Sequence, residues 1–194
     1  MNENLTEIVF ILDRSGSMSG LETDTIGGFN GFVKKQAEIG PTNLTTILFD
    51  DKYEILHNGV DAGKVFLTGR EYFTRGNTAL LDAVGKTIND VGKRLSETPE
   101  SQRPGKVIFI ITTDGLENAS STFSYGEIKR MITHQTEKYS WEFIFMGANI
   151  DVAAEGKKLG IRADRNFSFT SSKMGVSEMY TELHYTNTEI RKRK

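Results

Sequence analysis

The chain contains no cysteine among its 194 residues. This absence excludes disulfide bonds, thiolate metal sites and cysteine nucleophiles, and it fits a reducing compartment. Histidine is scarce as well, with three residues, so a soft metal ion has few possible ligands. The 24 basic and 26 acidic residues nearly balance, which argues against a dedicated nucleic-acid-binding protein. The basic ending "EIRKRK" is expected to be a solvated terminus and is assigned no function.

Long hydrophobic runs are also missing. The apolar part of "MNENLTEIVFILD" is only about six or seven residues long, too short for the core of a signal peptide or for a membrane span. No basic region precedes it. We therefore expect a soluble, cytoplasmic protein that does not contact membranes, and the sequence indicates no oligomeric state.

Four short apolar runs predict β-strands. They cover residues 7–13, 44–50, 106–114 and 141–148, and a weaker strand is expected at 166–169. The first, third and fourth runs are apolar at successive positions, which is typical of strands that are covered on both faces in a parallel sheet. After the second run, an Asp50-Asp51 turn predicts a short hairpin that forms an antiparallel edge.

Helix-length segments separate these runs. They cover residues 21–39, 79–96, 124–139, 151–159 and 174–191, and Ser124 with Glu127 forms a capping-box pattern at the start of the third. Strands that alternate with such helices predict an α/β fold. We expect a three-layer α/β/α sandwich around a mostly parallel sheet with one antiparallel edge hairpin, in a single domain over residues 1–194. Ligands of such sheets bind beyond the carboxyl ends of the strands, where the strand order reverses.

Oxygen-bearing side chains gather at the predicted strand ends. Asp13 ends the first run and Asp114 ends the third, so two carboxylates converge if these strands are neighbours. A bound cation would then favour the ionised form of both. Ser15 and Ser17 share one side of an extended segment with Asp13, and Thr78 offers a third hydroxyl at the start of the second helix. Such hard oxygen ligands suit Mg²⁺, with Mn²⁺ or Ca²⁺ as possible substitutes.

Each of these residues also has a purely structural interpretation. Asp13 and its serines could form an Asx-turn, Thr78 could cap the second helix, and Asp114 with Gly115 could form a simple turn. The conjunction of all three segments at strand ends or helix starts favours a metal site over these alternatives.

The segments "FILDRSGSM", "GNTAL" and "IITTDG" resemble the three parts of the metal-ion-dependent adhesion site (MIDAS) of von Willebrand factor type A (vWA) domains, the fold of integrin inserted domains. The resemblance covers about residues 5–165. It implies that Ser15 and Ser17 bind Mg²⁺ directly, that Thr78 binds it directly or through water, and that one or both of Asp13 and Asp114 act through water. It also implies that a carboxylate of a partner protein fills the sixth position. The stretch "FIFMGANIDVAAEGKKLGI" is similar to stand-alone bacterial cytoplasmic members of the family.

We therefore expect a Mg²⁺-dependent protein-binding module without catalytic activity. His57, His134 and His184 lie away from the predicted strand ends and are expected to be surface or packing residues. The alternative is a Mg²⁺-dependent phosphotransferase or phosphatase of the haloacid-dehalogenase type with Asp13 as nucleophile. That chemistry uses a second aspartate two positions on, where this chain has Ser15. A third possibility is an interaction domain that binds no metal.

Overall fold

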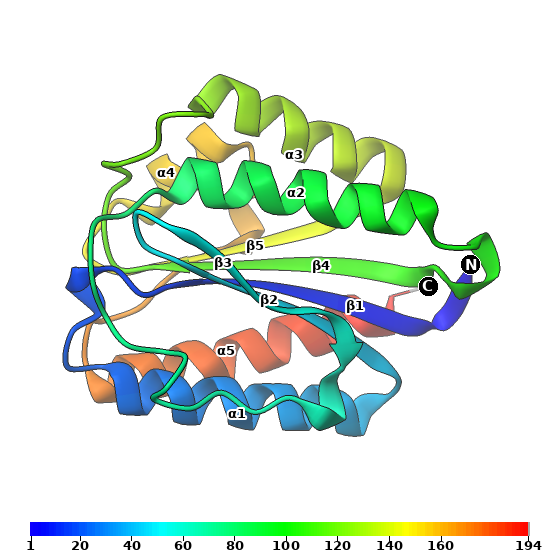
Figure 1. The fold of residues 1–194 in the computed structure, drawn as a ribbon, viewed down its shortest axis with the longest axis horizontal. Helices are drawn as coiled ribbons and strands as arrows, with labels where there is room; N and C mark the ends of the chain where they lie inside the picture. The colour runs from blue at the N-terminus through cyan, green and yellow to red at the C-terminus, as the bar shows by residue number, and fades with distance from the viewer. Residues whose placement is uncertain (194) are drawn as a thin grey trace.

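The computed structural model describes residues 1–193, which form one six-stranded sheet with helices on both faces (Figure 1). The strands are β1 (Asn2–Asp13), β2 (Thr42–Phe49), β3 (Tyr53–Asp61), β4 (Pro104–Thr113), β5 (Glu142–Gly147) and β6 (Asn166–Ser168). The α-helices are α1 (Glu22–Ile39), α2 (Leu80–Glu97), α3 (Tyr125–Tyr139), α4 (Val152–Leu159) and α5 (Lys173–Lys192). The expected three-layer α/β/α architecture is confirmed.

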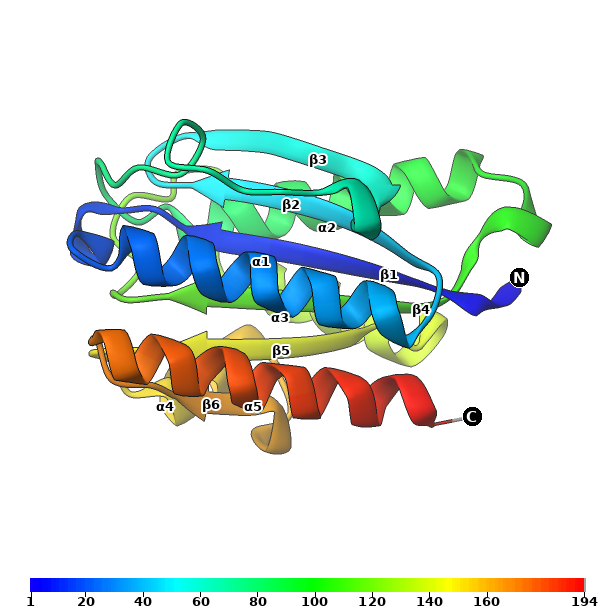
Figure 2. The same cartoon turned by 90° about the horizontal axis from the view of Figure 1, so that it is seen from below.

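Successive side chains of the buried strands point to opposite faces of the sheet and belong to two separate hydrophobic cores. In β1, Ile8, Phe10 and Leu12 pack with α1 and α5, whereas Val9 and Ile11 pack on the opposite face with α2, α3 and α4. Figures 1 and 2 show these two helical layers on either side of the sheet. The continuous apolar runs of the sequence thus serve a sheet that is covered on both sides.

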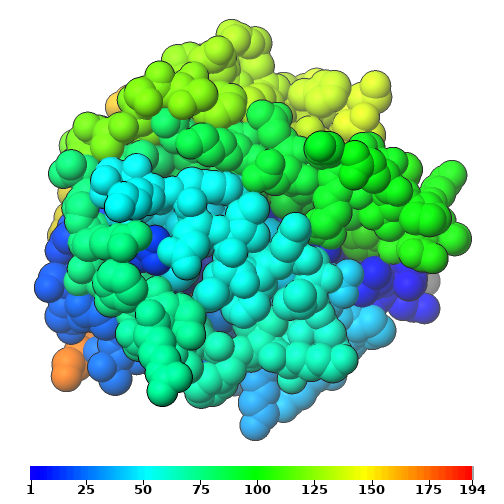
Figure 3. Space-filling model, in the orientation of Figure 1, coloured from blue at the N-terminus to red at the C-terminus, as the bar shows by residue number. Residues whose placement is uncertain are grey.

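The strand order is β3-β2-β1-β4-β5-β6, and among the strands of residues 1–193 the β2–β3 pair alone is antiparallel. The predicted edge hairpin is therefore confirmed, and β3 with the segment after it covers much of the side seen in Figure 3. Strands β2 and β3 lie on one side of β1, and β4, β5 and β6 lie on the other. The order reverses between β1 and β4, which pair in parallel with Leu12 opposite Thr112. Asp13, the last residue of β1, and Asp114, which follows β4, therefore lie at the ends of neighbouring strands.

The predicted boundaries agree closely with the structure for the helices and less well for β1. This strand starts at Asn2, several residues before the expected run at 7–13. Its first residues are polar and largely exposed, so that no apolar pattern marks them, although Asn2 pairs with Pro104. The capping box of Ser124 and Glu127 forms as expected. Within residues 1–193, no helix is both long and apolar enough to cross a bilayer.

Helices α1 and α5 lie side by side and approach closely (Figure 2). The ring of Tyr180 lies over Gly28, where a Cβ atom would come within 2.1 Å of the ring. Further along, the buried side chain of Gln36 accepts a hydrogen bond from Asn187 at 2.7 Å. Glycine thus allows close helix contact at one end, and a buried amide pair fixes the register at the other.

The two ends of the molecule differ in character. The start of β1 and the end of α5 lie at one end (Figures 1 and 2). The loops that follow β1, β4, β5 and β6 lie at the other end, which we call the carboxyl edge.

Candidate metal centre

The β1–α1 loop is organised around Asp13, whose side chain is buried at the end of β1. One carboxylate oxygen accepts the backbone N–H of Ser15 at 2.6 Å. The other accepts the hydroxyl of Thr113, the last residue of β4, also at 2.6 Å. The Asx-turn considered above is therefore present. It orients Asp13 without using all the lone pairs of its carboxylate, so the turn and a metal site are compatible.

Three hydroxyls lie close together at the carboxyl edge. The Oγ atoms of Ser15 and Ser17 lie 3.0 Å apart, with Ser15 buried and Ser17 exposed. A Cβ atom on Gly115 would lie 3.4 Å from Ser17 Oγ and 3.6 Å from Thr78 Oγ1. The β1–α1 loop, the segment before α2 and the loop after β4 thus meet at this glycine.

Thr78 does not cap helix α2. The helix starts at Leu80 with Ala79 in the N-cap position, and no side chain of that residue caps it. The carboxylate of Glu117 instead accepts the N–H of Leu81 at 3.0 Å. The interpretation of Thr78 as an N-cap is therefore wrong, and its hydroxyl faces the space beside Gly115.

Asp114 is buried and is more than part of a turn. One of its oxygens accepts a hydrogen bond from the side-chain amide of Asn149, and the other accepts one from the hydroxyl of Ser171. These donors lie after β5 and β6. No local motif in the sequence marks Asn149, Ser171 or Thr113 as a donor to these carboxylates, so sequence reasoning missed them. Asp151, two residues after Asn149, caps α4 through a 3.0 Å hydrogen bond from Ala154 N–H.

Within residues 1–193, the hydrogen-bond donors to Asp13 and Asp114 are all neutral. Burial raises the pKa of Asp13, and the hydrogen bonds from Thr113 and Ser15 offset that rise only in part. Such donors orient a carboxylate without cancelling its charge. The buried negative charge would therefore be compensated best by a cation at this position.

Two arginines that flank the predicted site residues in the sequence form ion pairs with other carboxylates. Arg14 and Arg75 both donate to Asp50, at 2.9 and 2.7 Å, and Arg14 also contacts Glu54 at 2.8 Å. Burial raises the pKa of Asp50, but hydrogen bonds from Arg75, the Lys52 N–H and Arg14 outweigh it, so that this pKa is lowered. Within residues 1–193, both guanidinium groups thus pair with Asp50 and not with Asp13 or Asp114.

The donor set fits a hard divalent cation. Five side chains supply hydroxyl or carboxylate oxygens, and Mg²⁺ binds such oxygens while it retains some water. In the part of the chain that the structure describes, no three His, Cys, Asp or Glu residues cluster as a metal site. The assignment of Asp13, Ser15, Ser17, Thr78 and Asp114 as metal ligands stays a prediction.

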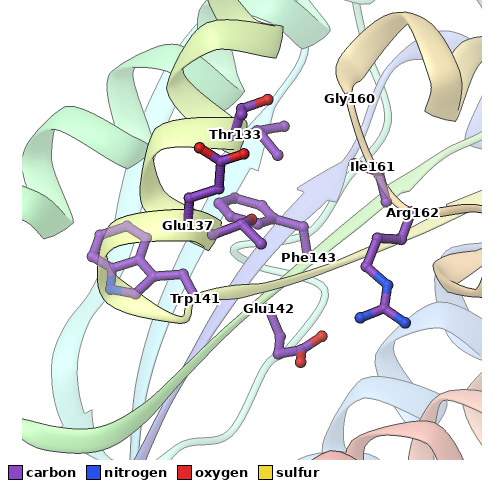
Figure 4. A pocket seen from close by; sticks show the side chains of 10 residues that line it. Thr133, Glu137, Trp141, Glu142, Phe143, Gly160, Ile161 and Arg162 are labelled. Atoms are coloured by element: carbon purple, nitrogen blue, oxygen red, sulfur yellow. The ribbon is translucent and has the colours of Figure 1, made fainter.

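The histidines lie on other elements. His57 is on β3, His134 is on α3 against the ring of Tyr139, and His184 is on α5 beside Gln36. A separate pocket between α3, β5 and the segment after α4 contains none of the predicted site residues (Figure 4). Figure 4 shows Glu137, Trp141 and Arg162 around it, near the amino end of β5 rather than at the carboxyl edge.

No protein-family model matches the sequence, and no curated protein matches it. Solved structures do match the fold. The vWF domain of the type V pili tip protein Mfa5 from Porphyromonas gingivalis aligns over 97% of each chain, with a TM-score of 0.67 and 12% identity. The chain has the vWA fold.

Other proteins with a vWA fold are similar over most of this chain. Manganese-loaded TRAP from Plasmodium vivax has a TM-score of 0.64 and 16% identity, over 92% of this chain and 73% of that one. Proximal thread matrix protein 1 from the mussel byssus, with a zinc-occupied MIDAS, has a TM-score of 0.62 and 16% identity. The match covers 94% of this chain but only 45% of the byssus protein, so the chain spans less than half the length of that relative.

Proposed function

We propose that this chain is a metal-dependent protein-binding module. A divalent cation, Mg²⁺ by preference, would be held at the carboxyl edge by Ser15, Ser17 and Thr78, with Asp13 and Asp114 beside it. The cation would supply a coordination position for a carboxylate of the partner protein. The observation that carries the proposal is the meeting of the Ser17 and Thr78 hydroxyls at Gly115, next to two buried carboxylates that accept hydrogen bonds from neutral donors.

The hydroxyl and carboxylate side chains would have different roles at the cation. The hydroxyls of Ser15 and Ser17 are neutral ligands, so a cation bound to them keeps much of its charge for an incoming anion. Asp13 and Asp114 compensate the charge of the cation from buried positions. Because the partner's carboxylate would bind the cation itself, metal binding and partner binding would be coupled.

A phosphotransferase that uses Asp13 as nucleophile has less support. Asp13 is buried, and Ser15 stands two positions on, where that chemistry uses a second aspartate. A nucleophilic carboxylate needs an oxygen that can approach the phosphorus atom of the substrate. The burial of Asp13 therefore supports binding rather than catalysis.

Ser17 offers the sharpest test, because it is exposed and its loss should not disturb the core. We expect Ser17→Ala to weaken Mg²⁺ binding at least about tenfold in calorimetry, an effect of ~1.4 kcal/mol. Ser19→Ala, the same change at another exposed position of the same loop, is the matched control and should bind like the wild type. Wild-type protein that binds neither Mg²⁺ nor Mn²⁺ would contradict the proposal and favour an inert interaction domain.

Partner binding is tested in the same design. Affinity capture from cells with wild-type protein in Mg²⁺ should recover a partner that EDTA releases and that Ser17→Ala fails to recover. Equal recovery in EDTA would rule out a metal-bridged contact.

A further inference from the structure

Asp114 is held by two loops that belong to the other half of the sheet. Asn149 follows β5 and Ser171 follows β6, and each donates to a different oxygen of the Asp114 carboxylate. Each carboxylate oxygen has two lone pairs, so one on each oxygen stays available for a metal-bound water or a cation. The pair of donors fixes the plane of the carboxylate but leaves its acceptor capacity open.

The sheet itself places both donors. The backbone N–H of Ala148 donates to Thr113 O at 3.0 Å, and the N–H of Phe169 donates to Gly147 O at 2.9 Å. The ends of β4, β5 and β6 are therefore joined in series beyond the last paired residues. This series brings the loops after β5 and β6 to Asp114, which directly follows β4.

The local backbone conformation fixes the position of both donors. Asn149 has φ = 56°, in the left-handed region that asparagine tolerates better than most residues. Ser171 precedes Ser172, the N-cap of α5, whose hydroxyl accepts Gly175 N–H at 3.1 Å. A Cβ atom on Gly175 would lie 2.0 Å from Thr170 O, so only glycine lets the first turn of α5 pack on the segment that carries Ser171.

We propose that Asn149 and Ser171 are positioning residues of the metal centre, which set the orientation in which the Asp114 carboxylate faces the cation. The inference rests on the proposed function. Partners in the outer shell of a metal site orient its ligands, and their loss typically lowers metal affinity by about 10–100-fold. The geometry gives Asp114 two such partners, whereas the family motif in the sequence includes neither.

The test compares two adjacent serines. Ser171→Ala removes a donor to Asp114, and Ser172→Ala removes the cap of α5 without touching Asp114. Calorimetric titration with Mg²⁺, well below the unfolding temperature of each variant, should show about tenfold weaker binding for Ser171→Ala and unchanged binding for Ser172→Ala. The melting temperature without metal should instead fall for Ser172→Ala, because a helix cap is lost.

Two further variants complete the design. Asn149→Gly removes the amide but keeps the positive φ, and it should weaken Mg²⁺ binding about as much as Ser171→Ala. Ser171→Thr keeps a hydroxyl and should restore the wild-type affinity.

The possible results separate this inference from the proposed function. If the wild type binds Mg²⁺ and Ser17→Ala does not, while Ser171→Ala and Asn149→Gly both bind like the wild type, the positioning role is overturned and the metal centre stands. If the wild type does not bind Mg²⁺, the proposed function and the inference fail together. A lower melting temperature of Ser171→Ala with unchanged Mg²⁺ affinity would show that the hydrogen bond only stabilises the fold.

Discussion

The substitution Gly115→Ala should weaken metal binding and leave the stability of the metal-free fold nearly unchanged. In Gly115→Ala the new carbon would lie 3.4 Å from Ser17 Oγ and 3.6 Å from Thr78 Oγ1, which are ordinary contact distances. The φ of Gly115 is not in the positive range, so the backbone accepts alanine. We therefore expect the unfolding free energy without metal to change by less than ~1 kcal/mol.

The effect on the cation should be larger. Mg²⁺ lies about 2.0–2.1 Å from each of its ligand oxygens and keeps several waters. A methyl group so near two of the proposed ligand oxygens would compete for space with those waters or with the partner's carboxylate. We expect Mg²⁺ affinity to fall about tenfold, which corresponds to ~1.4 kcal/mol.

Thermal shift with and without Mg²⁺ measures this change. At a Mg²⁺ concentration 100 times the wild-type Kd, binding stabilises the wild type by about 2.7 kcal/mol and a tenfold weaker variant by about 1.4 kcal/mol. For a chain of this size, the difference corresponds to a Mg²⁺-induced rise in Tm that is roughly 3–5 °C smaller.

The control for Gly115→Ala is Gly126→Ala, on α3, where the added Cβ would approach only the end of Arg130, at 3.8 Å. It should show the full Mg²⁺-induced rise in Tm. The reasoning is refuted if Gly115→Ala shows the same rise and the same calorimetric Kd as the wild type.

Three further predictions concern stability. Gly28→Ala places a Cβ atom 2.1 Å from the ring of Tyr180, so it should lower the unfolding free energy in urea by about 1–3 kcal/mol. Glu7→Ala removes the buried carboxylate that accepts Arg94 at 2.6 Å, and denaturant titration should show a loss of roughly 2–4 kcal/mol. Burial raises the pKa of Asp82, but three backbone N–H groups outweigh it, so the pKa is lowered. The stabilisation by Asp82 is therefore present above the unfolded-state pKa and is lost as the pH falls through the folded one. Asp82→Asn should thus lose less stability than the wild type between pH 6 and about pH 3, and an equal loss in both would contradict this assignment.

The architecture could be predicted because each element carries a local signal. The apolar run of β1 and the apolar residues of α2, which recur every three or four positions, are visible in a short window of the sequence. The convergence of Asp13 and Asp114 needed one further fact, that β1 and β4 are neighbours. The resemblance to vWA domains implied that arrangement, and the paired register confirms it.

The donors to the carboxylates could not be predicted in the same way. Ser171 is 57 residues from Asp114 in the sequence, and its hydroxyl resembles that of any serine before a helix. Thr113 lies in an apolar strand, where it looks like an ordinary β-branched residue. Their roles depend on which strand ends adjoin, and therefore on the tertiary structure.

The placement of the chain ends has a practical consequence for presentation. The start of β1 and the end of α5 both lie opposite the carboxyl edge (Figures 1 and 2). If the molecule is attached to a sensor surface, a bead or another polypeptide through either end, the candidate metal centre therefore faces the solution. Either attachment leaves the loops around Ser17, Thr78 and Asp114 free to meet a partner that approaches from solution.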